Sequence, residues 1–396
     1  MTDAQHHDVL IIGGGSAGIS VAARLNNLDI PLDVAIIEPA STHYYQPLWT
    51  LVGAGVVDLE DTGRPMADTI PPNTTWIQQA AAEFQPDRNA VITDQGQRFT
   101  YDYLVVAAGI QLDWDRVKGL EEALGHHGVC SNYSPDTVNY TWETLRSFRG
   151  GTALFTYPQN PIKCAGAPQK IMWLTEHFLE RQGLRDQAEV HFAASTGAIF
   201  GVDKYRRALE TLIDQRDIHT HFQHVLTEVR AEEQIAVFET TDGDTKEIAF
   251  DMLHAPPPQS APDFIKQSPL ANDEGWVDVD KYTTQHTSFD NVFSAGDCSS
   301  LPTSRTGAAI RKEVPVLVQN LLAHRRGEPL EAQYDGYASC PLVTGYGRLI
   351  LAEFDYDGNP CETFPFDQSQ ERYSMYALKL HTLPRMYWHG MLKGRA

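Results

Sequence analysis

Two cysteines that lie far apart in the chain are the residues best suited to carry out chemistry. Cys164 stands in YPQNPIKCAGAPQK and Cys340 in YASCPLVTGYGRLILAEF. A cysteine thiolate is a nucleophile, and two thiols that meet can form and break a disulfide. Cys164 follows Lys163 and precedes a predicted helix, and both an ammonium group and a helix N-terminus stabilise a thiolate. The residues alone leave open that each cysteine is buried and unreactive.

A glycine-rich loop near the N-terminus indicates a nucleotide. In DVLIIGGGSAG, three glycines have the spacing GxGxxG between a predicted strand and a predicted helix, and Glu38 ends the next predicted strand. The glycines let the chain turn tightly and bring backbone amides to a pyrophosphate, while the carboxylate can accept hydrogen bonds from a ribose. The predicted dinucleotide-binding residues of this unit are Gly13, Gly15, Ser16, Ala17, Gly18 and Glu38.

Two later segments favour FAD over NAD as the dinucleotide. Residues 103–109 and 292–297, the latter reading VFSAGD, resemble the strand motifs of flavoproteins that have two dinucleotide-binding domains. In those proteins the aspartate of the second motif contacts the ribityl chain, and the following helix directs its positive N-terminus at the flavin. We therefore predict FAD as the cofactor, with further contacts from Ala108, Gly109, Gly296 and Asp297.

The second half of the chain lacks a second glycine-rich fingerprint. A disulfide reductase or an NADH dehydrogenase of this fold repeats the fingerprint in its second domain. The corresponding turn here, TYPQNPIKCAGAPQ, carries Pro158 and Pro161 instead. Because proline has no amide hydrogen to donate, this turn is a poor pyrophosphate site. The second domain is therefore predicted to bind no nicotinamide, so that electrons come from another donor and leave to another acceptor.

Hydrophobic periodicity predicts the elements that position these residues. Predicted strands span residues 8–12, 34–37, 101–108, 151–156, 190–193, 248–253 and 292–295, and predicted helices span 19–28, 168–181 and 306–322. This alternation predicts an α/β fold with two Rossmann-like dinucleotide-binding domains, similar to glutathione reductase. The predicted units are a discontinuous FAD domain (1–112 and 278–328), an inserted NAD-binding-like domain (113–277) and an aromatic-rich C-terminal segment (329–396).

The segments around both cysteines also resemble those of the sulfide:quinone oxidoreductases, in particular the branch that includes the mitochondrial enzymes. The resemblance covers nearly the whole chain and is strongest in KCAGAPQKIMWL and YDGYASCPLVTGYGRLILAEFDY. It implies that Cys164 and Cys340 form a catalytic pair, held at rest as a disulfide or a trisulfide. In the implied mechanism, hydrosulfide attacks the pair and forms a persulfide on Cys340. The Cys164 thiolate then passes two electrons into FAD, and the reduced flavin passes them to a quinone. A small acceptor such as a thiol, sulfite or polysulfide removes the sulfane sulfur.

Further residues are candidates for supporting roles. Lys170 and Lys379 are cations in the matched segments, and they are candidates to stabilise reduced flavin or to polarise a quinone, with a solvated lysine as the alternative. Cys130, in GVCSNYS, lies where many bacterial members of the resembling family carry a third cysteine, and it is a candidate for a catalytic or flavin-proximal role. Aromatic residues of the C-terminal segment are candidate quinone contacts: Tyr346, Phe354, Phe364 and Phe366.

The end of the chain has the composition of a membrane-surface segment. Residues 372–392 read RYSMYALKLHTLPRMYWHGML, in which aromatic and methionine side chains are flanked by cations. The helical spacing through Tyr376 and Leu380 is predicted to end at Pro384. Such a segment suits an in-plane anchor at a membrane surface with the quinone nearby. Ordinary core or dimer packing is the alternative.

Composition limits the partners. The formal net charge of -21 argues against nucleic-acid binding and against broad attraction to anionic lipid. MTDAQHHDVLIIGGG reaches the first predicted strand without a basic leader, and no apolar run is long enough to cross a bilayer. We therefore predict a peripheral protein on the cytoplasmic side of a prokaryotic inner membrane, with no metal site and with scope for a homo-oligomer.

Three other functions are compatible with some of these features. A flavin-linked sulfide dehydrogenase with a cytochrome acceptor would use the same cysteines, but such proteins are exported and carry a signal peptide. A type II NADH dehydrogenase would share the fold, but the proline-rich second turn opposes it. A non-catalytic flavin-based sensor of sulfide or persulfide would need the cysteines and no quinone turnover.

Overall fold

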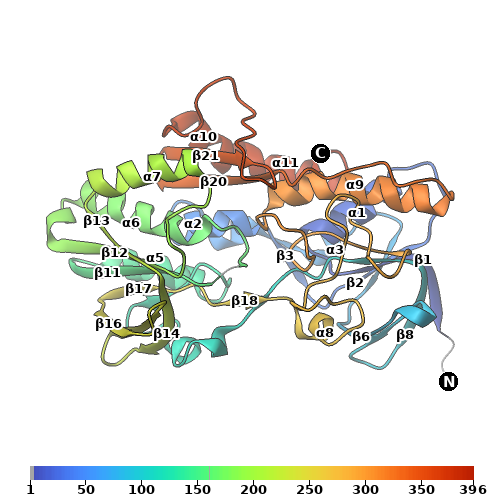
Figure 1. The fold of residues 1–396 in the computed structure, drawn as a ribbon, viewed down its shortest axis with the longest axis horizontal. Coiled ribbons are helices and arrows are strands. Elements are labelled where there is room, and N and C mark those ends of the chain that lie inside the picture. Colours follow the sequence, from blue (N-terminus) through green and yellow to red (C-terminus); the bar gives the residue numbers. More distant parts are fainter. Residues whose placement is uncertain (1–3, 160) are drawn as a thin grey trace.

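The computed structural model describes residues 4–159 and 161–396, and it has the predicted α/β fold (Figure 1). The first sheet has the order β5-β2-β1-β8-β7-β6, with β19 also paired to β8. Its strands are β1 (Gln5–Ile12), β2 (Val34–Ile37), β5 (Thr74–Ile77), β6 (Ala81–Gln85), β7 (Ala90–Thr93), β8 (Arg98–Val106) and β19 (Val292–Ser294). β1, β2, β5, β8 and β19 run parallel, so their carboxyl ends meet at one edge.

Two long helices cover this sheet and face each other. α1 (Ser16–Asn26) follows the glycine-rich turn, and α9 (Gly307–Arg325) follows β19. The apolar residues of β1 and β2 alternate between two cores because successive side chains point to opposite faces of a sheet. Val9 and Ile11 pack with the α1 side chains, whereas Leu10 and Ile12 pack in the second core.

The second sheet is parallel throughout, in the order β10-β17-β11-β12-β13. Its strands are β10 (Val129–Cys130), β11 (Gly151–Tyr157), β12 (Ala188–Ala194), β13 (Ile218–Phe222) and β17 (Met252–His254), and its helices are α5 (Val138–Ser147), α6 (Ala167–Gln182) and α7 (Asp203–Gln215). An antiparallel sheet of β14 (His224–Arg230), β15 (Ile235–Thr240) and β16 (Thr245–Ala249) accompanies it.

The prediction of one strand over residues 248–253 is wrong. The first part of this stretch ends β16, and the last part begins β17, which belongs to the other sheet. Asp251 lies between them, and its carboxylate accepts a hydrogen bond from the backbone amide of Thr152 at 2.8 Å. Residues 248–253 are apolar except for Asp251, so the end of β16, the turn and the start of β17 resemble one strand in the sequence.

The chain crosses between the two large sheets at a short antiparallel pair, β9 (Gln111–Leu112) with β18 (Gln259–Ser260). Residues after β18 pack in the core of the first sheet, among them Ile265 and Leu270. We therefore place the return to the first domain near residue 260 rather than at the predicted 277/278 boundary. The apolar residues between 260 and 277 show no helix or strand periodicity in the sequence, because they lie in loops and in the single turn of α8 (Asp263–Lys266).

The C-terminal segment lies as a layer across both sheets (red in Figure 1). The hairpin of β20 (Ala338–Gly345) and β21 (Arg348–Phe354) packs against α6 and α9. α10 (Tyr373–Ala377) continues through a π-helix (Leu378–Thr382) into α11 (Leu383–His389). The predicted end at Pro384 is wrong because this proline lies in the first turn of α11, where its missing amide hydrogen costs nothing.

The remaining strands and α-helices are short. They are β3 (Thr42–Tyr44), β4 (Gly63–Pro65), α2 (Trp49–Val52), α3 (Met66–Thr69) and α4 (Leu120–Ala123). Within the described ranges, no helix combines the length and the apolar character that crossing a bilayer requires.

Candidate active site

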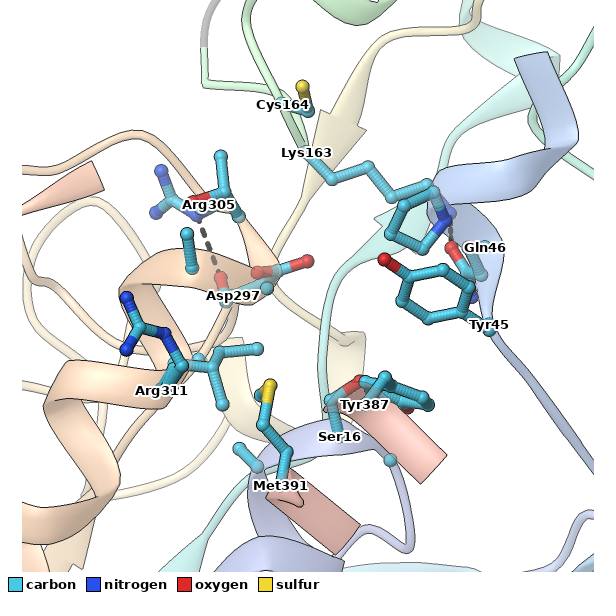
Figure 2. A pocket seen from close by; sticks show the side chains of 18 of the residues that line it. Ser16, Tyr45, Gln46, Lys163, Cys164, Asp297, Arg305, Arg311, Tyr387 and Met391 are labelled. Atoms are coloured by element: carbon cyan, nitrogen blue, oxygen red, sulfur yellow. Dashed lines mark hydrogen bonds between the residues drawn. The ribbon is translucent and has the colours of Figure 1, made fainter. Parts of the chain in front are cut away.

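The carboxyl edge of the first sheet opens into a cavity of about 610 Å³. Its wall includes the residues that directly follow the parallel strands, which is where open α/β sheets bind ligands. Figure 2 shows Cys164 and Lys163 at one end of the cavity and Ser16, Tyr387 and Met391 at the other.

The glycine-rich turn forms one wall by backbone alone. Gly13 has a φ of 103°, and a Cβ there would lie 2.4 Å from the carbonyl oxygen of Ala107. A Cβ on Gly18 would lie 1.9 Å from the carbonyl oxygen of Gly13, so this glycine permits the contact between α1 and the turn. Most of the predicted dinucleotide-binding residues line the cavity: Gly13, Gly15, Ser16, Ala17, Glu38, Ala108, Gly109, Gly296 and Asp297. Gly18 lies behind them.

Glu38 stands at the end of β2 with both carboxylate oxygens engaged. One oxygen accepts a hydrogen bond from the amide of Gly14 and the other from the amide of Ala40, each at 2.7 Å. An ionised carboxylate has about four acceptor positions. Glu38 can therefore fix the loop and still accept hydrogen bonds from a ribose.

Asp297 follows β19 in a group of buried charges. Burial raises the pKa of Asp297, and the nearby Arg305 guanidinium opposes that rise. Glu313 on α9 accepts a hydrogen bond from the amide of Gly296 at 2.7 Å, and burial raises its pKa to about 7. Sequence reasoning missed Glu313 because it lies inside a helix with no motif around it.

Cys164 and Cys340 lie 176 positions apart in the sequence, but they meet at the cavity. Their sulfur atoms are 3.3 Å apart, without a bond between them and close enough to form a disulfide when two electrons are removed. Cys164 lies in the loop before α6 and is held by its amide, which donates to the carbonyl of Arg305 at 2.8 Å. Cys340 is fully buried on β20. The structure thus brings together the pair that the sequence singled out.

The two thiols differ in acidity. The hydrogen bond between the sulfurs lowers the pKa of Cys164 well below its usual range against the opposing effect of burial, and the Lys170 ammonium lowers it further. The same hydrogen bond, together with burial, raises the pKa of Cys340 well above its usual range. Cys164 is therefore the thiolate of the pair and Cys340 the thiol.

Lys170, rather than Lys163, is the cation at the sulfur. Its Nζ lies 3.2 Å from the Sγ of Cys164, one turn along α6. Lys163 turns away and donates to the side-chain oxygen of Gln46 at 2.8 Å, so its predicted role as the neighbouring cation is wrong. Burial and the charge of Lys170 lower the pKa of Lys379 to about 7, while its Nζ donates to the carbonyl of Pro47 at 2.8 Å.

The loop before α6 is shaped around the sulfurs. Cys164 has a φ of 55°, a left-handed conformation that a residue with a Cβ rarely adopts. A Cβ on Gly166 would lie 2.4 Å from the sulfur of Cys340. The glycine in KCAG therefore lets β20 approach the loop closely enough for the two sulfurs to meet.

Cys130 does not join the pair. It is fully buried on β10, it lies outside the cavity wall, and its thiol donates to the carbonyl of Leu253 at 3.3 Å. Burial raises its pKa to about 12. The structure therefore gives no support to the predicted catalytic or flavin-proximal role. Cys298 is buried and Cys361 is partly exposed, and neither contacts the pair.

The four candidate quinone contacts are dispersed. Phe364 lines the cavity and stacks on Phe366 at 5.4 Å between ring centroids. Phe354 packs edge-on against Phe200 instead. Tyr346 lines a separate hollow of about 260 Å³ beside Trp142. Among the four predicted residues, only Phe364 is part of the cavity wall.

The C-terminal helix belongs to the nucleotide side of the cavity. The hydroxyl of Tyr387 lies 2.7 Å from the Oγ of Ser16 and 2.5 Å from the Nε2 of His43. Burial lowers the pKa of His43 to about 4, so the imidazole is neutral at pH 7. Tyr387, Trp388, Met391 and Leu392 are all buried. The predicted membrane anchor is wrong for these residues, since their apolar faces pack against the protein.

Comparison with known proteins identifies the family. The family profile described as "Pyridine nucleotide-disulphide oxidoreductase" matches residues 7–136 and 193–322. A mouse protein named "Sulfide:quinone oxidoreductase, mitochondrial" is 48% identical over 395 residues, which cover 99% of this chain and 88% of the relative. The Dictyostelium discoideum protein of the same name is 46% identical, with 98% and 86% covered. The chain belongs to the sulfide:quinone oxidoreductase family.

A solved structure supports the same fold. The sulfide:quinone oxidoreductase of Aquifex aeolicus superposes with a TM-score of 0.82 at 22% identity, covering 99% of this chain and 92% of that one. The prediction of a location at a prokaryotic inner membrane is wrong. The mouse and Dictyostelium discoideum relatives, at 48% and 46% identity, are named as mitochondrial proteins. The absence of a recognised leader does not determine where a protein resides.

Membership of the family implies a flavin, and the cavity fits one. Its volume lies within the usual range for ligand pockets. The bare backbone at Gly13 and the carboxylate of Glu38 suit the pyrophosphate and the ribose. Gly307 and Ala308, in the first turn of α9, also line the wall, where a helix N-terminus favours negative charge on a flavin.

Proposed function

We propose that this chain oxidises sulfide to sulfane sulfur on Cys164 and Cys340, with FAD as the cofactor and a quinone as the electron acceptor. The observation that carries the proposal is the pair of sulfurs 3.3 Å apart at a cavity built for a dinucleotide. The family membership and the proline-rich second turn support it, since neither favours NADH as the donor.

We propose different tasks for the two cysteines. Hydrosulfide attacks the sulfur of Cys340 in the oxidised pair, so that a persulfide forms there and Cys164 leaves as a thiolate. Cys164 is the better leaving group because its thiolate lies beside the ammonium of Lys170. A thiol, sulfite or polysulfide then takes the sulfane sulfur and leaves Cys340 as a thiolate. Closure of the disulfide between Cys340 and Cys164 releases two electrons, for which bound FAD would supply the acceptor and the route to the quinone.

Lys170 is protonated while Cys164 is a thiolate. Burial favours the neutral amine, but the Cys164 thiolate and the Cys340 sulfur beside it outweigh burial and raise the pKa of Lys170. A positive charge next to the reacting sulfur stabilises the thiolate. We therefore assign Lys170 to the sulfur side of the cavity, and Lys379 to a site between the sulfurs and the backbone of Pro47.

We further propose contact with a membrane surface through the exposed side of the C-terminal segment. Tyr373, at the start of α10, is 72% exposed, the highest value among the large apolar side chains that the structure describes as exposed. Phe364 and Phe366 lie partly exposed on the loop that precedes it. This patch is small, which favours peripheral attachment.

An anaerobic titration tests the function. Sulfide added to the purified yellow protein should bleach the flavin absorbance, and a short-chain quinone should restore it. Bleaching by NADH but not by sulfide would refute the proposal. Bleaching by sulfide without recovery by quinone would favour a cytochrome acceptor or a sensor. Cys164→Ser and Cys340→Ser should each keep the flavin and lose the bleaching by sulfide.

A further inference from the structure

The backbone of Cys164 is tied to a loop from another part of the chain. Its left-handed conformation, with a φ of 55°, is one that persists only where the surrounding structure imposes it. The amide of Cys164 donates to the carbonyl of Arg305 at 2.8 Å, and Lys163 and Arg305 pair as a parallel β-bridge. The position of the Cys164 sulfur therefore depends on the position of the Arg305 backbone.

The side chain of Arg305 fastens this second loop, which connects β19 to α9, to the turn that follows β19. Its Nε donates to the carbonyl of Asp297 at 2.8 Å, and its Nη2 donates to the carbonyl of Ser299 at 3.3 Å. Figure 2 shows the bond to Asp297, with Cys164 at the top of the view. The guanidinium also lies 4.0 Å from the centre of the Trp276 ring. A planar fork of donors suits this combination of two acceptors and an aromatic face.

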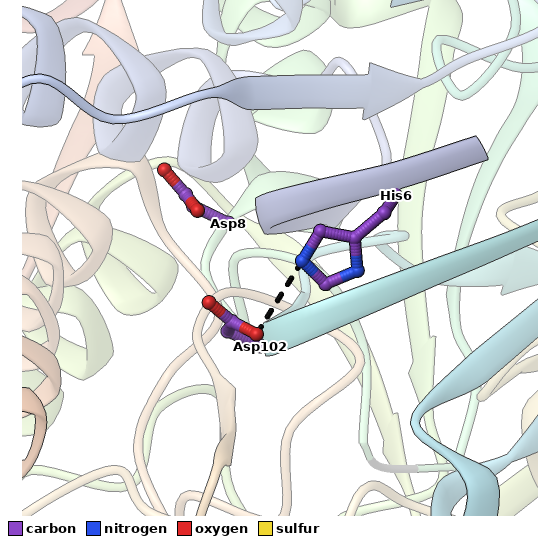
Figure 3. Close-up of side chains that lie close together, drawn as sticks. All are labelled: His6, Asp8 and Asp102. Atoms are coloured by element: carbon purple, nitrogen blue, oxygen red, sulfur yellow. Dashed lines mark ion pairs between the residues drawn. The ribbon is translucent and has the colours of Figure 1, made fainter.

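Partial burial gives these contacts more weight than a surface ion pair has. The pair of His6 with Asp102, beside Asp8, has a length of 3.4 Å, but the two side chains are 54% and 52% exposed (Figure 3). Exposed pairs of this kind contribute little because solvent and salt screen them. Arg305 lines the cavity instead, where burial lowers its pKa and the carboxyl of Asp297 opposes that fall. The guanidinium remains charged, since arginine keeps its proton in proteins.

We propose that Arg305 is a positioning residue for the sulfur pair. Its side chain binds the turn after β19, and its backbone carbonyl then holds Cys164 at the distance from Cys340 that disulfide formation requires. The inference deepens the proposed function and rests on it. Without the guanidinium, the loop gains freedom, Cys164 leaves its left-handed conformation, and its sulfur moves away from Cys340. A displacement of about 1 Å between reacting groups can lower a rate by a hundredfold.

Arg305→Met is the direct test, read out by the thiol–disulfide equilibrium of the pair. The purified flavoprotein is equilibrated without oxygen in mixtures of reduced and oxidised glutathione, free thiols are blocked with iodoacetamide, and mass spectrometry counts the two states. In this exchange Cys164 and Cys340 lose two protons and two electrons and form one S–S bond. Glutathione disulfide takes up both electrons and both protons, and its own S–S bond breaks.

The measured quantity is the effective concentration of the pair. It is the squared concentration of reduced glutathione divided by the concentration of glutathione disulfide, taken where half of the pair is oxidised. In Arg305→Met it should fall by roughly ten- to a hundredfold, and sulfide should bleach the flavin more slowly by a similar factor. A residue that only stabilised the fold would leave the effective concentration unchanged.

Two further variants separate positioning from flavin binding and from general stability. Arg305→Lys keeps a positive charge near Asp297 but replaces the fork by a single ammonium. It should retain the flavin and still lower the effective concentration. Arg185→Met is the matched control, because Arg185 likewise donates to three backbone carbonyls, each at 2.7 Å, and lies outside the cavity wall. It should leave the effective concentration at the wild-type value.

An unchanged effective concentration in Arg305→Met would overturn the inference. An equal fall in Arg185→Met would also overturn it, because the effect would then be one of general stability. A fall that accompanies loss of flavin and is absent from Arg305→Lys would do the same, since the flavin would then hold the loop. If sulfide fails to bleach the wild type, the proposed function fails. The glutathione equilibrium still decides the role of Arg305, because it needs neither sulfide nor quinone.

Discussion

Replacement of Lys170 by methionine tests the electrostatic basis of the sulfur chemistry. Methionine matches much of the length of lysine and removes the ammonium that lies 3.2 Å from the sulfur of Cys164. Lys170 is 4% exposed, so solvent screens this interaction little. A hydrogen bond to a charged group contributes about 1.5–3 kcal/mol, which equals a change of roughly ten- to a hundredfold in the population of the thiolate at a fixed pH.

The sign of the pH effect follows from the pKa of Cys164. The hydrogen bond from Cys340 and the charge of Lys170 lower this pKa, so the thiolate is present above it and is lost as the pH falls through it. Without Lys170 the pKa rises, and the acid limb of sulfide-driven bleaching should move to higher pH. Above the new pKa, the thiolate of the variant should recover.

The assay is alkylation of the reduced protein by iodoacetamide over a series of pH values, with the modified cysteine identified by mass spectrometry. Lys163→Met is the matched control, because the ammonium of Lys163 donates a hydrogen bond to Gln46 and not to the sulfur. We expect the pH profile of Cys164 alkylation to shift to higher pH in Lys170→Met and to stay unchanged in Lys163→Met. The reverse pattern, or no shift in either variant, would refute the reasoning.

Three further predictions concern the loop, the nucleotide side and the third cysteine. Gly166→Ala should slow sulfide-driven bleaching by roughly a hundredfold, because its Cβ would lie 2.4 Å from the sulfur of Cys340 and displace it; wild-type bleaching rates would contradict this. Tyr387→Phe should lower the free energy of unfolding by about 1–3 kcal/mol and weaken retention of the flavin, measured by denaturation and by flavin released on dialysis, because Ser16 and His43 lose a shared partner. In Cys130→Ser, sulfide should bleach the flavin at the wild-type rate, because the Cys130 thiol donates to a carbonyl outside the cavity. Loss of bleaching with the flavin retained would indicate a catalytic role for Cys130.

The nucleotide side of the site could be predicted from the sequence because its signals are local. The turn from Gly13 to Gly18 needs glycine for reasons that act within a few residues, and Glu38 stands where the next strand ends. The structure places these residues as expected, with Gly18 in the packing position. Such contacts depend on chain order, which the sequence contains directly.

The arrangement around the sulfurs could not be predicted in the same way, because it depends on contacts between segments that are distant in the sequence. The spacing of residues along the chain does not determine such contacts. Lys163 adjoins Cys164 in sequence, but Lys170, one helical turn further on, reaches the sulfur because side chains on one helix face point back toward the N-terminus. The aromatic composition of the C-terminal segment fits a membrane anchor and a core helix equally well. Only its packing on α1 decides between them for Tyr387 and Leu392.

The charges around the sulfurs link the redox state of the pair to protons. Three lysines line the cavity of a chain whose net charge is -21: Lys163, Lys170 and Lys379. Burial and the charge of Lys170 lower the pKa of Lys379 to about 7, and the sulfurs of the pair, with Cys164 as a thiolate, oppose that fall. A disulfide carries no charge, so in the oxidised pair the pKa of Lys379 falls further and its neutral amine is favoured. We therefore expect formation of the Cys164 thiolate to favour the protonated form of Lys379.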